Sequence, residues 1–185
     1  MPSLSLEIRD VIPSDISAIH KIYEEQVLNG ISSWEEEPPS AKELLRRCQA
    51  IQESGYPYRV ALLNGDLIGY CYASAYRPRV GYRFVVENSI YLAKQARGTG
   101  AAQQLMHDLI EHCIELGYRQ MIAIVGGSDN HASLKFHEKM GFVQVGLLPS
   151  IGFKFGDWLD SVILQLQLGD GGRALPKESR QISGS

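Results

Sequence analysis

The sequence lacks the features that would place it in a membrane or outside the cell. It has no apolar run near the roughly 18 residues that a membrane span needs, and no signal peptide is recognised at its amino terminus. Its cysteines are few: Cys48, Cys71 and Cys113 are widely spaced, odd in number and set in apolar patterns. Buried thiols fit this arrangement better than a disulfide, a metal ligand or a nucleophile. We therefore expect a cytoplasmic protein with no membrane partner and no metal ion.

The sequence also lacks a strong excess of charge of one sign and any internal repeat. The net charge is −3 at pH 7 and no basic patch stands out, so nucleic acid is not an expected partner. At 185 residues the chain is long enough for one domain with a substantial core. The periodic pattern of apolar residues ends at Gly169. We predict one domain over residues 1–168 and a disordered tail over residues 169–185.

The apolar patterns of this domain predict elements in the order β-α-α-β-β-β-α-β-α-β-β. Asn64-Gly65, between two apolar runs, indicates a hairpin, and residues 149–157 are interpreted as a linker between the last two strands. The predicted strands cover residues 4–12, 58–63, 67–76, 84–92, 121–125, 142–148 and 158–168, and the predicted helices cover 13–29, 40–54, 101–116 and 131–140.

The stretch from Glu87 to Gln103 carries the strongest functional signal. An apolar strand with Glu87 in its middle leads through Arg97-Gly98-Thr99-Gly100 into a helix. Small residues leave backbone N–H groups uncovered where a helix begins, and the helix dipole adds positive potential there, a combination that binds phosphate. A plain glycine-rich turn is the alternative. Gln103 stands where a dinucleotide fingerprint needs a small residue, and no Gly-Lys-Ser/Thr follows as in a P-loop.

The remaining pattern, Arg-x-x-Gly-x-Ala between strand and helix, resembles the pyrophosphate-binding motif of the GNAT superfamily of acyl-CoA-dependent N-acyltransferases. Further segments resemble the branch that contains the phosphinothricin, methionine sulfoximine and methionine sulfone acetyltransferases. In chain order these are Tyr76-Arg77-Pro78, Gly81-Tyr82-Arg83, Val86-Glu87-Asn88-Ser89-Ile90-Tyr91, Asn130-x-x-Ser133-x-x-x-His137-Glu138, Gly141-Phe142 and Gly152-x-Lys154-Phe155-Gly156-x-Trp158-x-Asp160.

The resemblance covers nearly the whole domain. It implies an α/β fold with a central mixed, mostly antiparallel sheet flanked by helices. It also implies transfer of acetyl from acetyl-CoA to the α-amine of a small amino acid, and it implies a homodimer.

Glu87 and His137 are the candidate catalytic residues. The acceptor amine is an ammonium at neutral pH and must lose a proton, so a base is needed. Glu87 interrupts an apolar strand, where a charge needs a reason; the alternative is a surface glutamate in a salt bridge. Most of the superfamily has at the position of His137 a tyrosine that acts as general acid. The phosphinothricin branch departs from this pattern, and this sequence looks similar to the branch here. Imidazole plays either acid or base, so His137 is a proton donor to the CoA sulfur or a partner of Glu87, the alternative being a helix histidine satisfied by a neighbour.

The resemblance also assigns contacts to acetyl-CoA. Backbone groups after Glu87 would serve the acetyl group and pantetheine arm, including an N–H for the developing oxyanion, and the amides of the turn would bind the phosphates. Asn130 is an N-cap, a CoA contact, or both; Arg97 meets the phosphates or is a surface arginine. The predicted residues are Ile90, Tyr91, Leu92, Arg97, Gly98, Thr99, Gly100, Ala101, Ala102, Gln103, Asn130 and Ser133.

The acceptor site is predicted around three arginines. Forked guanidinium donors bind carboxylate and phosphinate groups, so Arg77 and Arg83 are assigned to the acceptor, with solvated loop arginines as the alternative. Trp34 forms an apolar wall or packs under its loop, and Lys154, Trp158 and Asp160 shape the pocket or a dimer contact. The predicted acceptor residues are Trp34, Arg77, Pro78, Arg79, Tyr82, Arg83, Glu87, Asn88 and Ser89.

Two other functions stay open. The same chemistry with a polyamine, an aminoglycoside or a protein N-terminus is one, although the arginines argue against a polycation. A non-catalytic acyl-CoA sensor is the other, and the presence of both Glu87 and His137 argues against it. Because no nucleophilic cysteine lies near the motif, we expect direct transfer with both substrates bound.

Overall fold

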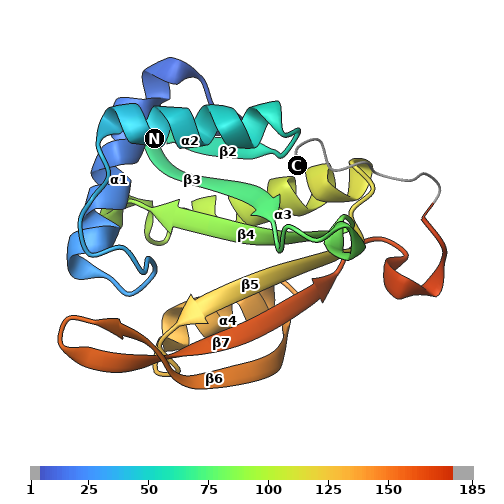
Figure 1. Ribbon diagram of the computed structural model, residues 1–185. Coiled ribbons are helices and arrows are strands. Elements are labelled where there is room, and N and C mark those ends of the chain that lie inside the picture. Colours follow the sequence, from blue (N-terminus) through green and yellow to red (C-terminus); the bar gives the residue numbers. More distant parts are fainter. Residues whose placement is uncertain (1–4, 177–185) are drawn as a thin grey trace.

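The computed structural model describes residues 5–176, and its elements follow the predicted order (Figure 1). The strands are β1 (Leu6–Asp10), β2 (Tyr58–Leu63), β3 (Asp66–Ala75), β4 (Val85–Leu92), β5 (Gln120–Gly126), β6 (Val143–Lys154) and β7 (Asp157–Gln167). The helices are α1 (Ile16–Asn29), α2 (Ala41–Glu53), α3 (Ala101–Glu115) and α4 (His131–Lys139). The predicted mixed sheet flanked by helices is confirmed.

The strands form one sheet in the order β1-β2-β3-β4-β5-β7-β6. Neighbouring strands are antiparallel except β4 and β5, which run parallel and pair only over Val85–Glu87 and Gln120–Ile122. Beyond Glu87, β4 stays with β3 as far as Leu92, whereas β5 stays with β7 as far as Gly126. The two strands therefore separate in the middle of the sheet.

Alternating side chains divide the core between the two faces of the sheet. On one face α3 buries Leu105, Met106 and Leu109 against residues such as Val86. On the other face α1 and α2 pack against a cluster of tyrosines, which includes Tyr91. Consecutive residues of β4 therefore face opposite layers of the molecule.

The end of the sheet differs from the sequence prediction. Residues 149–154, predicted as part of a linker, continue β6, and a tight turn at Phe155 and Gly156 leads directly into β7. The register shifts between Leu148 and Gly152. Pro149 suggested a break, but an edge strand tolerates proline at a bulge, because the missing N–H does not interrupt a ladder on both sides.

Other local predictions are confirmed. Asn64 and Gly65 both have positive φ in the β2–β3 turn, as a two-residue type I′ hairpin turn requires. Cys48, Cys71 and Cys113 are buried and form no disulfide. Between residues 5 and 176, no helix is long and apolar enough to cross a membrane.

The predicted tail is only partly described. Residues 169–176 contain a short 3₁₀ turn at Gly171–Arg173, and Asp170 forms an ion pair with Arg119 at 3.3 Å. Residues 177–185 lie outside the described part of the chain, and the boundary at residue 168 stays a prediction.

Candidate active site

A pocket of about 380 Å³ lies where β4 and β5 separate. It is bounded by the two strands, by the loop that joins α1 to α2, and by α4. Its lining comprises Tyr23, Ile31, Ser32, Ser33, Trp34, Glu35, Glu87, Asn88, Ser89, Ile90, Tyr91, Ala123, Ile124, Val125, Gly126, Asn130, Ser133 and His137. The structure thus brings the two predicted catalytic residues into one cavity.

Glu87 enters this pocket from the last parallel pairing position of β4. Its side chain is partly buried, and this burial raises the pKa of the carboxyl group. Within residues 5–176 it has no ion pair, so the salt bridge of the alternative interpretation is not formed there. A carboxylate with a raised pKa and no cationic partner is suited to accept a proton.

His137 lies on α4 and is 4% exposed. Its Nδ1 is 2.9 Å from the Ser133 carbonyl oxygen, which can only accept, so Nδ1 carries a proton. Burial lowers the pKa of His137, which favours the neutral ring. Nε2 is then unprotonated, and it accepts from the Asn88 amide nitrogen at 3.3 Å. In this state Nε2 has no proton to donate.

Asn88 is the neighbour of Glu87 on β4, so their side chains point to opposite faces of the sheet. Because its amide nitrogen faces His137, its Oδ1 points elsewhere, and this buried oxygen has no partner among the described residues. Glu87 and the Asn88–His137 pair approach the pocket from opposite layers. They meet only because β4 and β5 part between them.

The predicted phosphate-binding turn has the required backbone. Gly98 and Gly100 have φ of 75° and 82°, and a Cβ on either would meet nothing within 4 Å. Gly100 is the N-cap residue of α3, while Thr99 donates to the Ala96 carbonyl at 2.7 Å and accepts from Ala101 N–H at 3.2 Å. The first turn of α3 beyond Ala101 keeps amides without intrahelical acceptors. This open cradle at a helix N-terminus fits a phosphate group.

The other predicted acetyl-CoA residues divide into two groups. Ile90, Tyr91, Asn130 and Ser133 line the pocket, whereas Leu92 packs toward the α3 core. The Asn130 side chain accepts from Ser133 N–H at 3.3 Å and donates to the Gly126 carbonyl oxygen at 3.3 Å. Its N-cap function is therefore formed, and a contact to CoA stays a prediction. Arg97, Ala102 and Gln103 also belong to the α3 turn and stay predictions in the same way.

The predicted arginine site lies apart from the pocket. The chain from Tyr76 to Phe84, with a 3₁₀ turn at Val80–Tyr82, connects β3 to β4 at the end opposite their separation from β5 (Figure 1). Arg77 packs over the rings of Tyr76 and Tyr82. Arg79 and Pro78 are exposed. Arg83 packs over Phe84 and donates to the Val80 carbonyl oxygen. Their role in acceptor binding stays a prediction, since the pocket lining has no arginine or lysine among the described residues.

Trp34, Asn88 and Ser89, by contrast, do line the pocket. The Trp34 ring lies against Gly152 of β6, where a Cβ would come within 2.1 Å of its Cζ3. Sequence reasoning missed Glu35, which also lines the pocket. Arg47 of α2 donates to its Oε1 at 2.7 Å, and its buried Oε2 has no partner in residues 5–176. Glu35 stands in a run of three glutamates, so nothing in the sequence distinguished it from a solvated acidic stretch.

Comparisons with known proteins agree with this geometry. The family model "Acetyltransferase (GNAT) domain" matches residues 8–163. The chain is 46% identical over 170 residues to a phosphinothricin N-acetyltransferase of Alcaligenes faecalis, covering 92% of this chain and 86% of that protein. It is 36% identical over 166 residues to an L-methionine sulfoximine/L-methionine sulfone acetyltransferase of Pseudomonas paraeruginosa, covering 89% and 96%.

A solved structure extends the similarity to three dimensions. The crystal structure of a GNAT superfamily phosphinothricin acetyltransferase from Sinorhizobium meliloti in complex with AcCoA superposes with a TM-score of 0.90 at 45% identity, covering 94% of each chain. The structure of yncA from Salmonella typhimurium with its cofactor acetyl-CoA has a TM-score of 0.86 at 33% identity, covering 90% of this chain and 96% of that one.

Proposed function

The chain belongs to the GNAT family of acetyl-CoA-dependent N-acetyltransferases, and from this premise we propose that it acetylates the α-amine of phosphinothricin, methionine sulfoximine or methionine sulfone. The observation that carries the proposal is the partly buried Glu87 carboxylate in the pocket between β4 and β5, which forms no ion pair within residues 5–176. Relatives named for these acceptors match most of the chain. Acetyl-CoA supplies the acetyl group as co-substrate.

Binding of acetyl-CoA is assigned to the cradle and the parting strands. The open backbone at Gly98 and Gly100 receives the pyrophosphate. The pantetheine arm follows β4 past Ile90 and Tyr91, which lie beyond the last β4 residue that pairs with β5. This route delivers the thioester into the pocket that holds Glu87 and His137.

Proton transfer is assigned to Glu87 and to the acceptor amine itself. Glu87 takes one proton from the acceptor ammonium, directly or through a water molecule, and the free amine attacks the thioester carbon. The new C–N bond forms as the C–S bond breaks, and the second amine proton goes to the departing thiolate. His137 is not the proton donor in this scheme, because its Nε2 is an acceptor in the hydrogen-bonded state. It holds Asn88 beside the reacting groups instead.

The acceptor site is proposed to begin at the wall formed by Trp34 and Glu35. The carboxylates of Glu35 and Glu87, which both line the pocket, attract the acceptor ammonium. Arg77 and Arg83 remain the proposed partners of the acceptor's carboxylate or second anionic group, at the outer end of β4. An acceptor that reached both regions would have to extend along β4.

A homodimer is proposed through the β6–β7 hairpin. β6 is an edge strand of the sheet, and the β6–β7 hairpin exposes several large apolar side chains to solvent. An edge strand can pair with its own copy across a two-fold axis. The exposed residues are Val143, Val145, Leu147, Leu148, Ile151, Phe153, Phe155 and Trp158. Light scattering of the protein as it elutes from a size-exclusion column should give twice the chain mass. The variant Val145→Lys should give the mass of the monomer. A monomeric wild type contradicts the proposal.

The first test of the activity is thiol release from acetyl-CoA with a panel of acceptors. It should contain phosphinothricin, methionine sulfoximine, methionine sulfone, the common amino acids, spermidine, an aminoglycoside and a peptide. We expect turnover with the first three. Turnover confined to spermidine, the aminoglycoside or the peptide would overturn the acceptor assignment and keep the chemistry. Binding of acetyl-CoA without turnover on any acceptor would favour the sensor function.

A further inference from the structure

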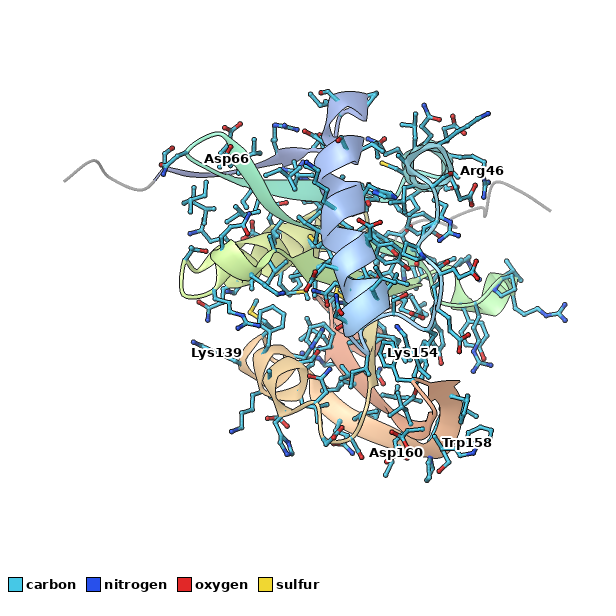
Figure 2. All side chains as sticks on the ribbon, turned by 90° about the vertical axis from the view of Figure 1, so that its left-hand side faces the viewer. Arg46, Asp66, Lys139, Lys154, Trp158 and Asp160 are labelled. Carbon is cyan, nitrogen blue, oxygen red and sulfur yellow. The ribbon has the colours of Figure 1, made fainter. Side chains whose placement is uncertain are left out.

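Lys154, the last residue of β6, is a buried lysine that the reaction scheme does not use. It is 1% exposed. Its Nζ donates to the Ser33 carbonyl oxygen at 2.7 Å and to the Gly30 carbonyl oxygen at 2.9 Å. Figure 2 shows Lys154 between the end of α1 and the β6–β7 hairpin that carries Trp158 and Asp160. The ammonium group thus connects two segments that are more than 120 residues apart in the sequence.

The environment of this ammonium group is unusual. A buried charge is costly unless hydrogen bonds replace its hydration. Burial lowers the pKa of Lys154, while Glu36 and Glu35 act in the opposite direction. Within residues 5–176 its direct hydrogen-bond partners are main-chain carbonyls rather than a carboxylate, and the Phe155 ring lies 4.8 Å away. A cation held in this way fixes the path of a backbone segment.

The segment that it fixes is one wall of the acceptor pocket. Residues 31–35 all line the pocket. Lys154 binds the Gly30 carbonyl, just before this wall, and the Ser33 carbonyl, in its middle. On the same inward side of β6, Gly152 leaves room for the Trp34 ring. Tyr23 adds a hydrogen bond to the Ser33 hydroxyl at 2.9 Å. The position of this wall therefore depends on the position of the β6–β7 hairpin, to which Lys154 fastens it.

We propose that Lys154 is a positioning residue that sets acceptor affinity by fastening the 30–35 loop to the β6–β7 hairpin. It acts through the positions of Trp34 and Glu35, without touching the substrate. The proposal rests on the proposed function, because it names the acceptor side of the same pocket. The acetyl-CoA cradle at Gly98 and Gly100 lies on other elements, so its affinity should not depend on Lys154.

The kinetic test compares Lys154→Met with Lys139→Met. Methionine keeps an unbranched apolar stem but leaves both carbonyl oxygens without their donor, and Lys139 is an exposed lysine of α4 that serves as the matched control. We expect KM for the acceptor to rise about tenfold in Lys154→Met, with KM for acetyl-CoA unchanged. An equal rise in both constants, or none beyond the control, would overturn the proposal.

A second measurement does not depend on turnover. The sequence has two tryptophans, so in a Trp158→Phe background Trp34 is the only fluorescent indole. Adding Lys154→Met should shift its emission to longer wavelength and increase its quenching by acrylamide about twofold, a change that Lys139→Met should not produce. An unchanged signal would overturn the proposal. A changed signal in a protein that acetylates no amino acid would leave the fastening intact and remove only the proposed function.

Lys154→Arg keeps the test decisive if the methionine variant does not fold. The guanidinium retains a positive charge and hydrogen-bond donors, but its planar fork cannot reproduce both contacts of the ammonium group. We expect a smaller, severalfold rise in acceptor KM at constant KM for acetyl-CoA. A folded Lys154→Arg protein with wild-type acceptor KM and wild-type Trp34 quenching would overturn the proposal.

Discussion

Gly152→Ala should move one wall of the acceptor pocket while leaving the acetyl-CoA site in place. A Cβ at residue 152 would lie 2.1 Å from Trp34 Cζ3, whereas ordinary contact begins at 3.4 Å. The ring must therefore move by about 3.4 − 2.1 = 1.3 Å. Trp34 is 40% exposed, so it can shift outward without unfolding the core.

The expected cost of this shift is modest for stability and larger for binding. Overpacking costs about 1–3 kcal/mol, and the partial exposure of Trp34 favours the lower end. About 1 kcal/mol corresponds to a fall in Tm of roughly 2–4 °C for a chain of this size. A wall displaced by more than 1 Å should lower kcat/KM for the acceptor about tenfold, comparable to a mismatched methylene in an apolar pocket.

The assay pairs thermal melting with steady-state kinetics in both substrates. Gly146→Ala on the same strand is the matched control, because a Cβ there would lie 3.6 Å from Ile163, an ordinary contact. We expect only Gly152→Ala to lose acceptor kcat/KM, with KM for acetyl-CoA unchanged in both. If Gly152→Ala lowers Tm but keeps the acceptor kinetics of the control, Trp34 is not a wall of the acceptor site and the reasoning fails.

Three further outcomes are expected. Because burial raises the pKa of Glu87, activity should fall as the pH drops through a value above the pKa of an exposed glutamate. Glu87→Gln should lower kcat roughly 10²–10⁴-fold and abolish this acidic limb of the pH–activity profile. If the acidic limb is retained in the variant, it belongs to another group. Asn88→Asp places a carboxylate next to His137 Nε2, now 3.3 Å from the amide nitrogen, and should raise the pKa of His137 in an NMR titration; an unchanged titration would contradict the hydrogen-bond assignment. Gly100→Ala puts a side chain at φ 82°, which costs about 1 kcal/mol, and should raise KM for acetyl-CoA severalfold with no change for the acceptor. A change in acceptor KM alone would place the phosphates elsewhere.

The sequence by itself determined the order of the elements and drew attention to several residues of β4 and α4 that line the pocket. Strand and helix periods, the Asn64-Gly65 turn and the Asn130 cap are read from residues close together in the chain. Glu87 was recognisable because a charge inside an apolar strand breaks a local pattern. Local signals of this kind depend on backbone geometry, so they need no knowledge of the tertiary structure.

Only the tertiary structure decided what surrounds those residues. The 149–154 segment continued β6 despite its proline, because an edge strand accepts a bulge. The arginines around residue 80 turned out to lie outside the pocket lining. Glu35 and Lys154 obtained their roles from contacts with Arg47 and with the carbonyls at residues 30 and 33. The Lys154 contacts join segments more than 120 residues apart in the chain, and the Glu35–Arg47 contact joins a loop to a helix, so no local sequence pattern encodes either of them.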